Sequence, residues 1–406
     1  MTVERLIVVG ASLAGLRAAE AARGAGYGGA IALIGEEPHL PYGRPPLSKR
    51  ILEAGPLPES TRLRAYETLT EDLNVELVLG AAATGIDTNR KTVTVGERSI
   101  DYSAAVIATG AAARRIPGPA ETLSGVHVLR THDDAHAVRA ALDANARTVV
   151  IGGGFIGSEV ACAARKRGLP VTVVEARTAP LTRSVGPDLG AALTRIHRAH
   201  GTQVSCGAEV AAIEGERGTV ARVCLTDGTV LGADLVVVGI GTVPATDWLA
   251  GSGVGVDDGV VCDEFLATGA EGVYAAGDVA NWHNSLFGRR MRVEHWSSAA
   301  EQGARAALNA IDPATAQPYS TVPYFWSDWY EHRIQFVGVP GHQGYEVVSG
   351  ALDSDHFVVL YRDGDLLGAA LTLNGQRHIM KYRNLINRRV SFDEACAYAR
   401  ARAASK

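Results

Sequence analysis

The middle of the chain carries three glycines in the spacing G-x-G-x-x-G, at Gly152, Gly154 and Gly157. An apolar run of strand length precedes them, a helix-period segment over 158–167 follows, and a second apolar run ends on Glu175. In this arrangement the first glycine permits a tight turn, the second lets backbone approach a pyrophosphate, and the third lets helix and strand pack closely. The helix N-terminus faces the phosphates, and the glutamate can accept hydrogen bonds from a ribose 2′-hydroxyl. The stretch therefore predicts a dinucleotide site rather than a glycine-rich structural turn.

The N-terminal part of the chain repeats this pattern. Strands are predicted over 6–9 and 31–34, with an alanine-rich helix between them. The loop before the helix carries Gly10, Ser12 and Gly15, and the second strand runs into Glu36 and Glu37. Serine replaces the middle glycine, but its small side chain still permits close approach of a phosphate. Two such folds predict two dinucleotides, or one retained and one vestigial, and either glutamate can serve the ribose.

Length and composition exclude several classes of protein. A chain of 406 residues has room for two to three domains. A net charge of −5 gives no overall basic character that would suggest binding to nucleic acid. No apolar run approaches about 18 residues, so no membrane-spanning helix is expected. The apolar N-terminal run is broken by glycines and lacks a cleavage pattern, so it does not read as a signal peptide, and a cytoplasmic location is predicted.

The cysteines do not form a redox pair in the sequence. They are five in number and scattered, at Cys162, Cys206, Cys224, Cys262 and Cys396. Disulfide reductases with paired dinucleotide domains need two closely spaced cysteines, and no C-x-x-C or C-x-x-x-x-C occurs here. All five are expected to be buried, small hydrophobic residues.

The remaining chain alternates strands and helices and then changes character. A proline-rich segment over 39–55 is predicted to be rigid and extended. Strands are predicted over 75–79, 92–95, 102–110, 233–240 and 272–278, with further strands within 203–237, and helices over 131–145, 186–200 and 297–310. Beyond residue 325, strands over 334–337, 356–361 and 366–373 surround the hairpin turn Asp363-Gly364, and helices follow over 377–386 and 393–403.

In this order the landmarks resemble the glutathione-reductase-like flavoproteins that have two dinucleotide domains. More narrowly, they resemble the NADH-dependent ferredoxin reductases of bacterial cytochrome P450 and Rieske-type oxygenase systems. The matching segments are GASLAG (10–15), PYGRPPLSK (41–49), ATG (108–110), GGGFIGSE (152–159), GIGTVP (239–244), YAAGDVA (274–280), EHWSSAAEQG (294–303) and FWSDWYEHRIQFVG (325–338). The PPLSK and FWSD segments are the specific ones, because the glycine loops occur in a far larger superfamily.

The resemblance implies an α/β fold with two Rossmann-like dinucleotide-binding domains and an α+β C-terminal domain. The FAD-binding domain would be discontinuous, over 1–112 and 246–322. The NADH-binding domain would span 113–245, and the C-terminal domain 323–406. The chain departs from the family at Gly43, where an acidic residue is usual, at Trp329, where glutamine is common, and at Asn374-Gly375-Gln376.

The resemblance also implies roles at the FAD site. Gly10, Ser12 and Gly15 would cradle the pyrophosphate, Lys49 would place a cation near flavin N5, and Asp278 would bond the ribityl chain, unless it is a plain turn cap. A positive charge near N5 favours the electron-rich reduced flavin. Further FAD contacts are expected from Glu36 or Glu37, Arg44, Thr109, Gly110 and Trp296.

At the NADH site, Glu159 would lie near both the nicotinamide and Lys49, although a glutamate in this position can also simply serve the helix dipole. Glu175 favours NADH because a 2′-phosphate would meet a carboxylate. Arg177 and Arg183 leave the choice against NADPH open, since arginines accommodate that phosphate in NADPH enzymes. The expected NADH contacts are Gly152, Gly154, Ile156, Gly157, Glu159, Glu175, Arg183 and Gly241.

The implied reaction passes electrons from NADH through FAD to a [2Fe–2S] ferredoxin. Such ferredoxins are usually acidic, so a basic patch on the reductase would steer them. Candidate docking residues are Arg289, Arg290, Arg292 and Arg333, although each also fits a solvated charged turn. A monomer or weak homodimer is expected, without metal. The alternatives are an NADH oxidase, a rubredoxin reductase, or a flavoprotein that resembles apoptosis-inducing factor and signals by binding partners.

Overall fold

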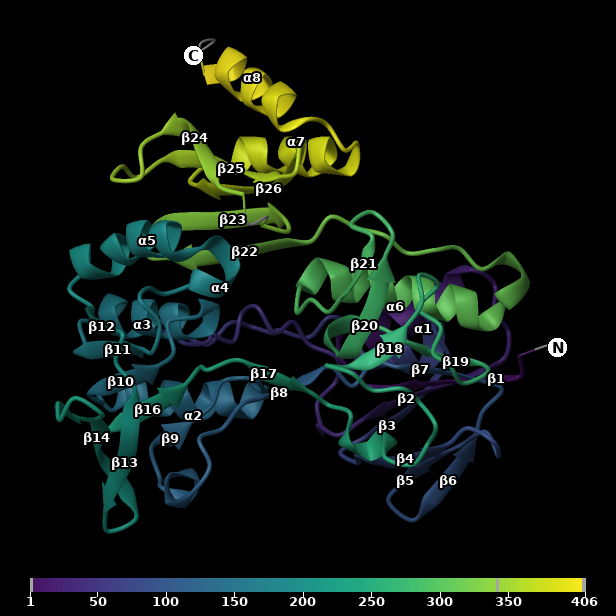
Figure 1. Ribbon diagram of the computed structural model, residues 1–406. Coiled ribbons are helices and arrows are strands. Elements are labelled where there is room, and N and C mark those ends of the chain that lie inside the picture. The colour runs from purple at the N-terminus through teal and green to yellow at the C-terminus, as the bar shows by residue number, and fades with distance from the viewer. Residues whose placement is uncertain (1–2, 341–342, 404–406) are drawn as a thin grey trace. The chain divides into compact units, whose positions relative to one another are not determined.

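The computed structural model describes residues 3–340 and 343–403, in which the chain forms two compact units. Unit 1 comprises Met1–Gly43, Ser60–Ala112 and Val243–Pro323, and unit 2 comprises Arg44–Glu59, Ala113–Thr242 and Tyr324–Lys406. The chain passes between the units along the paired strands β8 (Ala111–Ala113) and β17 (Thr242–Pro244) (Figure 1). Each unit is built on its own parallel sheet, as the two repeated sequence patterns predict.

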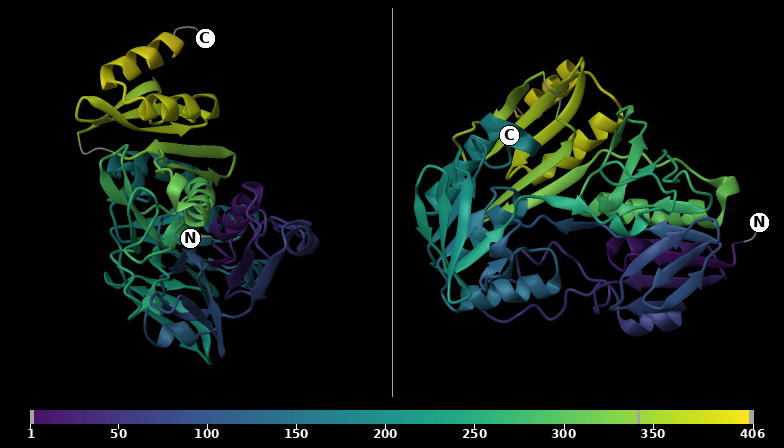
Figure 2. Two further views of the ribbon diagram at one scale, coloured as in Figure 1. Left: turned by 90° about the vertical axis from the view of Figure 1, so that its right-hand side faces the viewer. Right: turned by 60° about the horizontal axis from the view of Figure 1, so that its bottom comes forward.

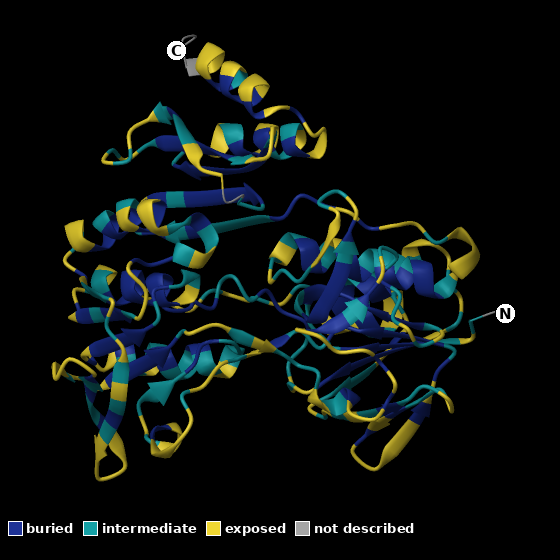
Figure 3. Cartoon of the chain, in the orientation of Figure 1, coloured by how far each residue is buried: buried dark blue, intermediate teal, exposed yellow. Residues whose placement is uncertain are grey.

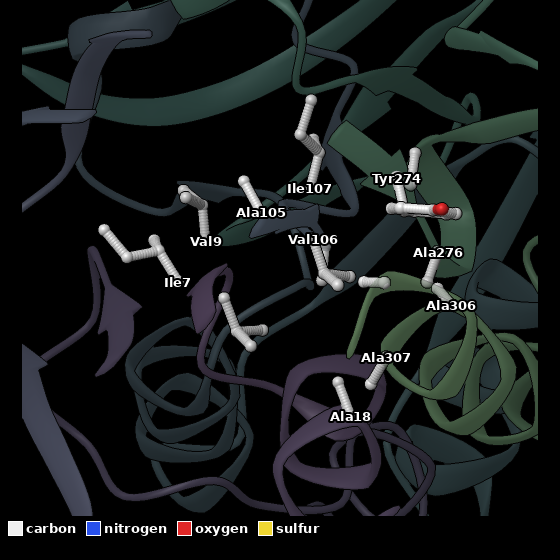
Figure 4. Packing of buried hydrophobic residues seen from close by; sticks show 14 of the residues in the cluster. Ile7, Val9, Ala18, Ala105, Val106, Ile107, Tyr274, Ala276, Ala306 and Ala307 are labelled. Carbon is white, nitrogen blue, oxygen red and sulfur yellow. The ribbon is translucent and has the colours of Figure 1, made fainter. Parts of the chain in front are cut away.

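The parallel sheet of unit 1 has the strand order β19-β7-β1-β2-β3. Its strands are β1 (Arg5–Val9), β2 (Ala30–Gly35), β3 (Val75–Leu79), β7 (Ala104–Ile107) and β19 (Val273–Ala275). The central strands are buried along almost their whole length, because helices or loops cover both faces of a parallel sheet. Helices α1 (Leu13–Gly24) and α6 (Trp296–Ile311) pack together. Small residues let them approach: Ala18 and Ala307 lie beside this sheet in Figure 4.

Two three-stranded sheets complete unit 1. The first has the order β4-β5-β6 and the second β18-β20-β21. Their strands are β4 (Ala83–Asp87), β5 (Thr92–Val95), β6 (Arg98–Asp101), β18 (Val260–Cys262), β20 (Ala280–Asn284) and β21 (Arg289–Met291). Short helical turns are η1 (Thr68–Asp72), η3 (Asp247–Leu249), η4 (Gly277–Val279) and η5 (Pro313–Thr315).

The parallel sheet of unit 2 has the order β12-β11-β10-β16-β9. Its strands are β9 (Val126–His127), β10 (Thr148–Ile151), β11 (Val171–Glu175), β12 (Gln203–Cys206) and β16 (Leu235–Val238). Its helices are α2 (His132–Asp143), α3 (Phe155–Lys166), α4 (Thr182–Val185) and α5 (Pro187–Ala199), with the short turn η2 (Pro119–Thr122). The antiparallel strands β13 (Val210–Glu216), β14 (Thr219–Leu225) and β15 (Val230–Gly232) form a separate sheet.

The C-terminal part of unit 2 is an antiparallel sheet with two helices. The strand order is β22-β23-β26-β25-β24. The strands are β22 (Tyr324–Trp329), β23 (His332–Gly338), β24 (Tyr345–Gly350), β25 (Phe357–Asp363) and β26 (Leu366–Leu373). Helices α7 (Gln376–Asn387) and α8 (Phe392–Ala403) pack on one face of this sheet (Figure 2). Its other face shares a buried cluster with α5, so the sheet and the dinucleotide fold are packed together within unit 2.

The α/β fold is confirmed, and most predicted elements are present to within a few residues. The buried strands and exposed loops alternate as expected for such a fold (Figure 3). The prediction of an extended segment over 39–55 is wrong for residues 44–52, which form successive turns, with Leu47 N–H donating to the Arg44 carbonyl and Leu52 N–H to the Lys49 carbonyl. Proline fixes a φ near −65° that also suits such turns. Across the described ranges, no helix is both long and apolar enough to cross a membrane.

The segment Arg44–Glu59 belongs to unit 2, although the sequence prediction assigned it to the FAD-binding domain. Arginines from the helices of unit 2 hold it by donating to its carbonyls. Arg139 donates to Ile51 at 2.8 Å, and Arg167 donates to Leu52 at 2.8 Å. These bonds carry the lysine-bearing part of PPLSK onto the unit that holds the second glycine loop. The division into three domains itself stays a prediction.

Candidate active site

The first glycine loop, in unit 1, leaves no space for side chains at two positions. Gly10 has φ +123°, and a Cβ built there would lie 2.0 Å from the Ala108 carbonyl oxygen. A Cβ at Gly15 would lie 2.0 Å from the Gly10 carbonyl oxygen. The turn and the close approach of α1 to β1 therefore both need glycine, as the fingerprint requires.

The second loop, in unit 2, has the same geometry. Gly152 has φ +103°, and a Cβ at Gly157 would lie 2.1 Å from the Gly152 carbonyl oxygen. The middle glycine is different: a Cβ at Gly154 would be 3.8 Å from its nearest neighbour, the Gly239 carbonyl oxygen. The fold itself thus tolerates a side chain at this position, and glycine serves the approach of a ligand. This explains how Ser12 can occupy the matching position of the first loop.

The helices at these loops begin without side-chain caps among the described residues. Ser12 precedes α1 and Gly154 precedes α3, and neither supplies a side-chain capping bond. Helix α6, which begins at Trp296, is also uncapped. By contrast, α2 has a full capping box between Thr131 and Asp134. The first amides of α1 and α3 are thus available to phosphate oxygens, which helix N-termini bind well.

The carboxylates at the strand ends differ in how they are held. Glu175 ends β11, and its two oxygens accept the Gly153 N–H at 2.7 Å and the Arg177 N–H at 2.8 Å. These bonds aim the carboxylate into the glycine loop. In unit 1, Glu37 accepts the Tyr42 hydroxyl at 2.5 Å, whereas Glu36 is exposed just beyond β2.

The other predicted FAD residues of unit 1 lie at the ends of its strands. Thr109 and Gly110 follow β7, and the Thr109 hydroxyl donates to the Ala245 carbonyl at 2.8 Å. Asp278 lies in η4, directly after β19. Trp296 opens α6 and is 39% exposed. Thr109, Gly110 and Asp278 are thus near the carboxyl ends of parallel strands, where ligands of open α/β sheets bind, whereas Trp296 follows the antiparallel strand β21.

The other predicted site residues of unit 2 differ in exposure, backbone conformation and hydrogen bonding. Ile156, on the first turn of α3, is an exposed apolar side chain at 41%. Gly241 has φ +104° and follows β16. Arg183 is exposed on α4. The Arg44 guanidinium donates to the Arg130 carbonyl at 2.6 Å.

Lys49 and Glu159 form an ion pair between a partly buried lysine and a buried glutamate, which brings together the two predicted catalytic residues. The Lys49 ammonium lies 2.7 Å from a Glu159 carboxylate oxygen, with the glutamate side chain only 3% exposed. Two serine hydroxyls also donate to this carboxylate, from Ser48 at 2.5 Å and Ser327 at 2.5 Å. The indole N–H of Trp329 donates to the Ser327 hydroxyl oxygen at 3.0 Å. A buried charge is stable only with such partners, so the role of Glu159 exceeds a contribution to the helix dipole.

Sequence reasoning did not identify Ser48, Ser327 or Trp329 as part of this site. Ser48 and Ser327 lie 111 and 168 residues from Glu159. Both occur in segments that carry the family resemblance, PPLSK and FWSD, but nothing in a single sequence pairs them with a helix of the dinucleotide fold. Trp329 stood out only as a departure from the family.

The candidate docking arginines are mostly engaged by the chain itself. Arg292 pairs with Asp258 at 3.3 Å and Glu294 at 2.7 Å. The remaining contacts are from Arg290 to the Cys262 carbonyl at 3.0 Å and from Arg333 to Asp328 at 3.3 Å, while Arg289 and Arg290 are both exposed. The charges of Arg292 and Arg333 are therefore partly neutralised, which weakens them as steering groups.

The cysteines, all within the described part of the chain, are free thiols. Cys162, Cys262 and Cys396 are buried, but the expectation of burial is wrong for Cys206 and Cys224, which are partly exposed. Burial raises the pKa of the Cys162 and Cys262 thiols to about 12. Neither thiol is ionised at neutral pH, so neither is a reactive nucleophile.

Acid is expected to destabilise unit 2 through His197, which is buried against Trp329 with ring centroids 4.4 Å apart. Desolvation, aided by the nearby His200, lowers the pKa of His197 from 6.5 to about 4. The unfolded chain binds a proton in this window that the folded chain excludes. The contribution of His197 to the free energy of unfolding is therefore complete above pH 6.5. It decreases as the pH falls towards 4, by on the order of 3 kcal/mol.

Urea unfolding at a series of pH values between these limits measures this loss. A His197→Gln variant should lose less stability across the window than the parent chain, because glutamine takes up no proton. Equal pH dependence in the two proteins would contradict this assignment.

Two glycine loops on separate parallel sheets, a lysine–glutamate ion pair and five free thiols define a flavin-dependent pyridine nucleotide oxidoreductase without a redox disulfide. Family comparison agrees: residues 4–303 match the pyridine nucleotide-disulphide oxidoreductase family and residues 324–403 match the reductase C-terminal domain. The chain belongs to this family. Its members use FAD and a pyridine nucleotide, which confirms the predicted cofactors and class of enzyme.

Characterised relatives match over nearly the whole chain. Rhodocoxin reductase of Rhodococcus erythropolis is 36% identical over 94% of this chain and 89% of its own length. Putidaredoxin reductase of Pseudomonas putida is 34% identical, covering 95% and 92%. A solved structure of the covalent putidaredoxin reductase–putidaredoxin complex matches with a TM-score of 0.92 and 32% identity, covering 99% of both chains. The resemblance drawn from the sequence is confirmed.

Proposed function

We propose that this protein is an FAD-dependent NADH:ferredoxin oxidoreductase. It passes electrons from NADH through FAD to a [2Fe–2S] ferredoxin that serves a cytochrome P450 or Rieske-type oxygenase. The observation that carries the proposal is the match over 99% of both chains to a reductase that was solved in complex with putidaredoxin. Relatives named as reductases of oxygenase systems, including the benzene 1,2-dioxygenase system of Pseudomonas putida, support it.

The residues of unit 1 fit FAD. Gly10 and Gly15 form a cradle that a Cβ would fill, and the uncapped amides of α1 supply donors for the pyrophosphate. Glu36 or Glu37 is assigned to the adenosine ribose: Glu37 accepts the Tyr42 hydroxyl, and both carboxylates keep lone pairs for a ribose hydroxyl. Asp278 is assigned to the ribityl chain. Thr109, Gly110, Trp296 and Arg44 remain proposed FAD contacts on the family resemblance.

The residues of unit 2 fit NADH. Gly154 has room that its own chain does not use, and α3 offers uncapped amides to the pyrophosphate. Each oxygen of Glu175 accepts one backbone N–H and keeps a lone pair for a ribose hydroxyl. A 2′-phosphate would meet this carboxylate, so NADH is preferred over NADPH. Ile156 and Gly241 are assigned to the nucleotide, and Arg183 remains a proposed contact.

Lys49 and Glu159 are assigned to the hydride-transfer step. The lysine supplies a fixed positive charge, and the buried glutamate holds that charge in one position. When bound, FAD accepts two electrons as a hydride and releases them singly, which is what a one-electron ferredoxin needs. The protein contributes binding, orientation and electrostatics to this chemistry. We further propose a cytoplasmic location, as a monomer or weak homodimer.

Ferredoxin-dependent electron transfer is the expected result of a direct assay. The purified yellow protein should reduce cytochrome c with NADH. Adding a bacterial [2Fe–2S] ferredoxin should raise the rate about tenfold or more. Oxygen uptake, recorded in parallel, should account for little of the NADH consumed. Salt should slow the ferredoxin-dependent rate, because charge steers the encounter.

The alternatives give different results in the same assay. NADH consumption that goes mainly to oxygen, whichever ferredoxin is present, would replace this function with that of an NADH oxidase. A response to rubredoxin alone would indicate a rubredoxin reductase. Substituting Arg289, an exposed member of the proposed docking arginines, with glutamate tests the docking assignment: the rate with ferredoxin should fall while flavin reduction by NADH stays unchanged.

A further inference from the structure

A chain of hydrogen bonds runs from the Lys49–Glu159 ion pair to the indole of Trp329. Ser327 and Trp329 lie two residues apart on β22, so their side chains point to the same face of the strand. The Trp329 N–H donates to Ser327 at 3.0 Å, and the Ser327 hydroxyl donates to Glu159 at 2.5 Å. Both residues are fully buried, at 0% exposure. These hydrogen bonds therefore lie in the interior, where water does not compete for their donors and acceptors.

The direction of these bonds is determined by chemistry. An indole nitrogen only donates, so the Ser327 oxygen must act as its acceptor. The single hydroxyl hydrogen of Ser327 is then directed to the Glu159 carboxylate, which only accepts when it is ionised. Trp329 thus prevents the serine hydroxyl from turning towards another acceptor. The carboxylate receives this bond on Oε1, the same oxygen that Lys49 contacts at 2.7 Å.

Packing keeps the indole itself from moving. Trp329 belongs to the cluster that joins α5 to the C-terminal sheet, and its ring lies against His197 with centroids 4.4 Å apart. Glutamine is a useful comparison for the tryptophan at this position. Glutamine also carries an N–H donor, but it has more rotatable bonds and less buried surface to hold it. The tryptophan therefore keeps the donor while making it rigid.

We propose that Trp329 is a positioning residue that acts through Ser327 to hold Glu159, and with it the Lys49 ammonium, in the geometry needed for reduction of the flavin by NADH. The inference rests on the proposed assignment of this ion pair to the hydride-transfer step. Trp329 itself touches neither the lysine nor the glutamate in this network. Its effect passes through one serine hydroxyl.

Trp329→Phe removes the N–H and keeps an aromatic ring. The rate constant for flavin reduction by NADH, followed by stopped-flow absorbance, should fall about fivefold, the effect of one neutral hydrogen bond. The NADH concentration at half-saturation should stay within about twofold, because the nucleotide loop is untouched. Trp329→Gln restores a donor and should recover most of the rate, and Ser327→Ala should be slower than either tryptophan variant.

A second measurement does not depend on turnover. The rate at which an N-hydroxysuccinimide ester acylates Lys49, read by peptide mass spectrometry, should rise in Trp329→Phe relative to Lys91. Lys91 forms an exposed pair with Glu271 at 3.2 Å and serves as the internal reference. The lysine should react faster once its glutamate is held less firmly.

The matched control is Trp282→Phe. Trp282 is also fully buried, and its indole N–H has no hydrogen-bond partner among the described residues. Loss of rate in Trp282→Phe equal to that in Trp329→Phe, or failure of glutamine to recover the rate, would overturn the proposal in favour of a packing role. Flavin reduction is measured without ferredoxin, so failure of electron transfer to ferredoxin would be a separate result that affects only the proposed function.

Discussion

Replacing Glu159 with glutamine is expected to slow NADH-driven reduction of the flavin on the order of 100-fold while FAD stays bound. The carboxylate is 3% exposed and accepts from Lys49, Ser48 and Ser327. Glutamine keeps the size of the side chain but puts an NH₂ group among these donors and removes the counter-charge of the lysine. Lys49 is partly exposed, so without its counter-charge the ammonium should turn towards water and leave its position.

Lys49→Met should have a similar effect, and the double variant should be little worse than either single variant. Groups that act as one unit give such non-additive losses. The matched control is Lys91→Met, which breaks an exposed ion pair and should leave the rate unchanged. Stopped-flow absorbance of the oxidised flavin measures all four variants. Additive losses, or parental rates in Glu159→Gln, would show that the pair has no joint role.

The second large effect that we expect is a loss of affinity for one nucleotide at a time, depending on which glycine loop is changed. Gly15→Ala should weaken FAD binding about 10- to 100-fold, and Gly157→Ala should weaken NADH binding by a similar factor while the protein stays yellow. The added Cβ would lie 2.0 Å from the Gly10 carbonyl oxygen in the first case and 2.1 Å from the Gly152 carbonyl oxygen in the second. Each helix N-terminus must then move away from its phosphates.

Two further variants distinguish an added side chain that disturbs the protein's own structure from one that only obstructs the ligand. Gly154→Ala places its Cβ 3.8 Å from the nearest atom, so melting temperature should be unchanged while NADH affinity falls. Gly24→Ala, near the end of α1 with nothing within 4 Å among the described residues, should leave both affinities unchanged. Bound FAD is measured by absorbance and NADH by fluorescence titration. Loss of both nucleotides from either loop variant would contradict the assignment of one nucleotide to each loop.

The glycine loops were predictable from sequence because their constraint is local. Gly10 and Gly152 need a positive φ, and Gly15 and Gly157 face backbone within the same turn. All of these contacts are formed by residues near in sequence or on adjacent strands. The same locality explains why most strands and helices were placed correctly.

The errors and omissions arise where distant segments determine the structure. Prolines at Pro45 and Pro46 suit either an extended segment or a series of turns, and bonds from Arg139 and Arg167 hold the segment in unit 2. The docking arginines were proposed on charge alone. The structure shows that Arg292 already has acidic partners within the chain. A local pattern in the sequence does not show which acidic residues an arginine will pair with in the folded chain.

The carboxylate of Glu159 also has a consequence for how the chain folds. Its partners come from Lys49 and Ser48 near the N-terminus and from Ser327 near the C-terminal sheet, at separations of 111 and 168 residues for the two serines. Until all three segments have assembled, α3 must bury a charge without its counter-ion, which is unfavourable. Long loops must therefore close before unit 2 gains its full stability, and contacts of such separation slow folding. Residues 113–242 expressed alone should be only partly stable, and unit 2 should unfold as one cooperative body.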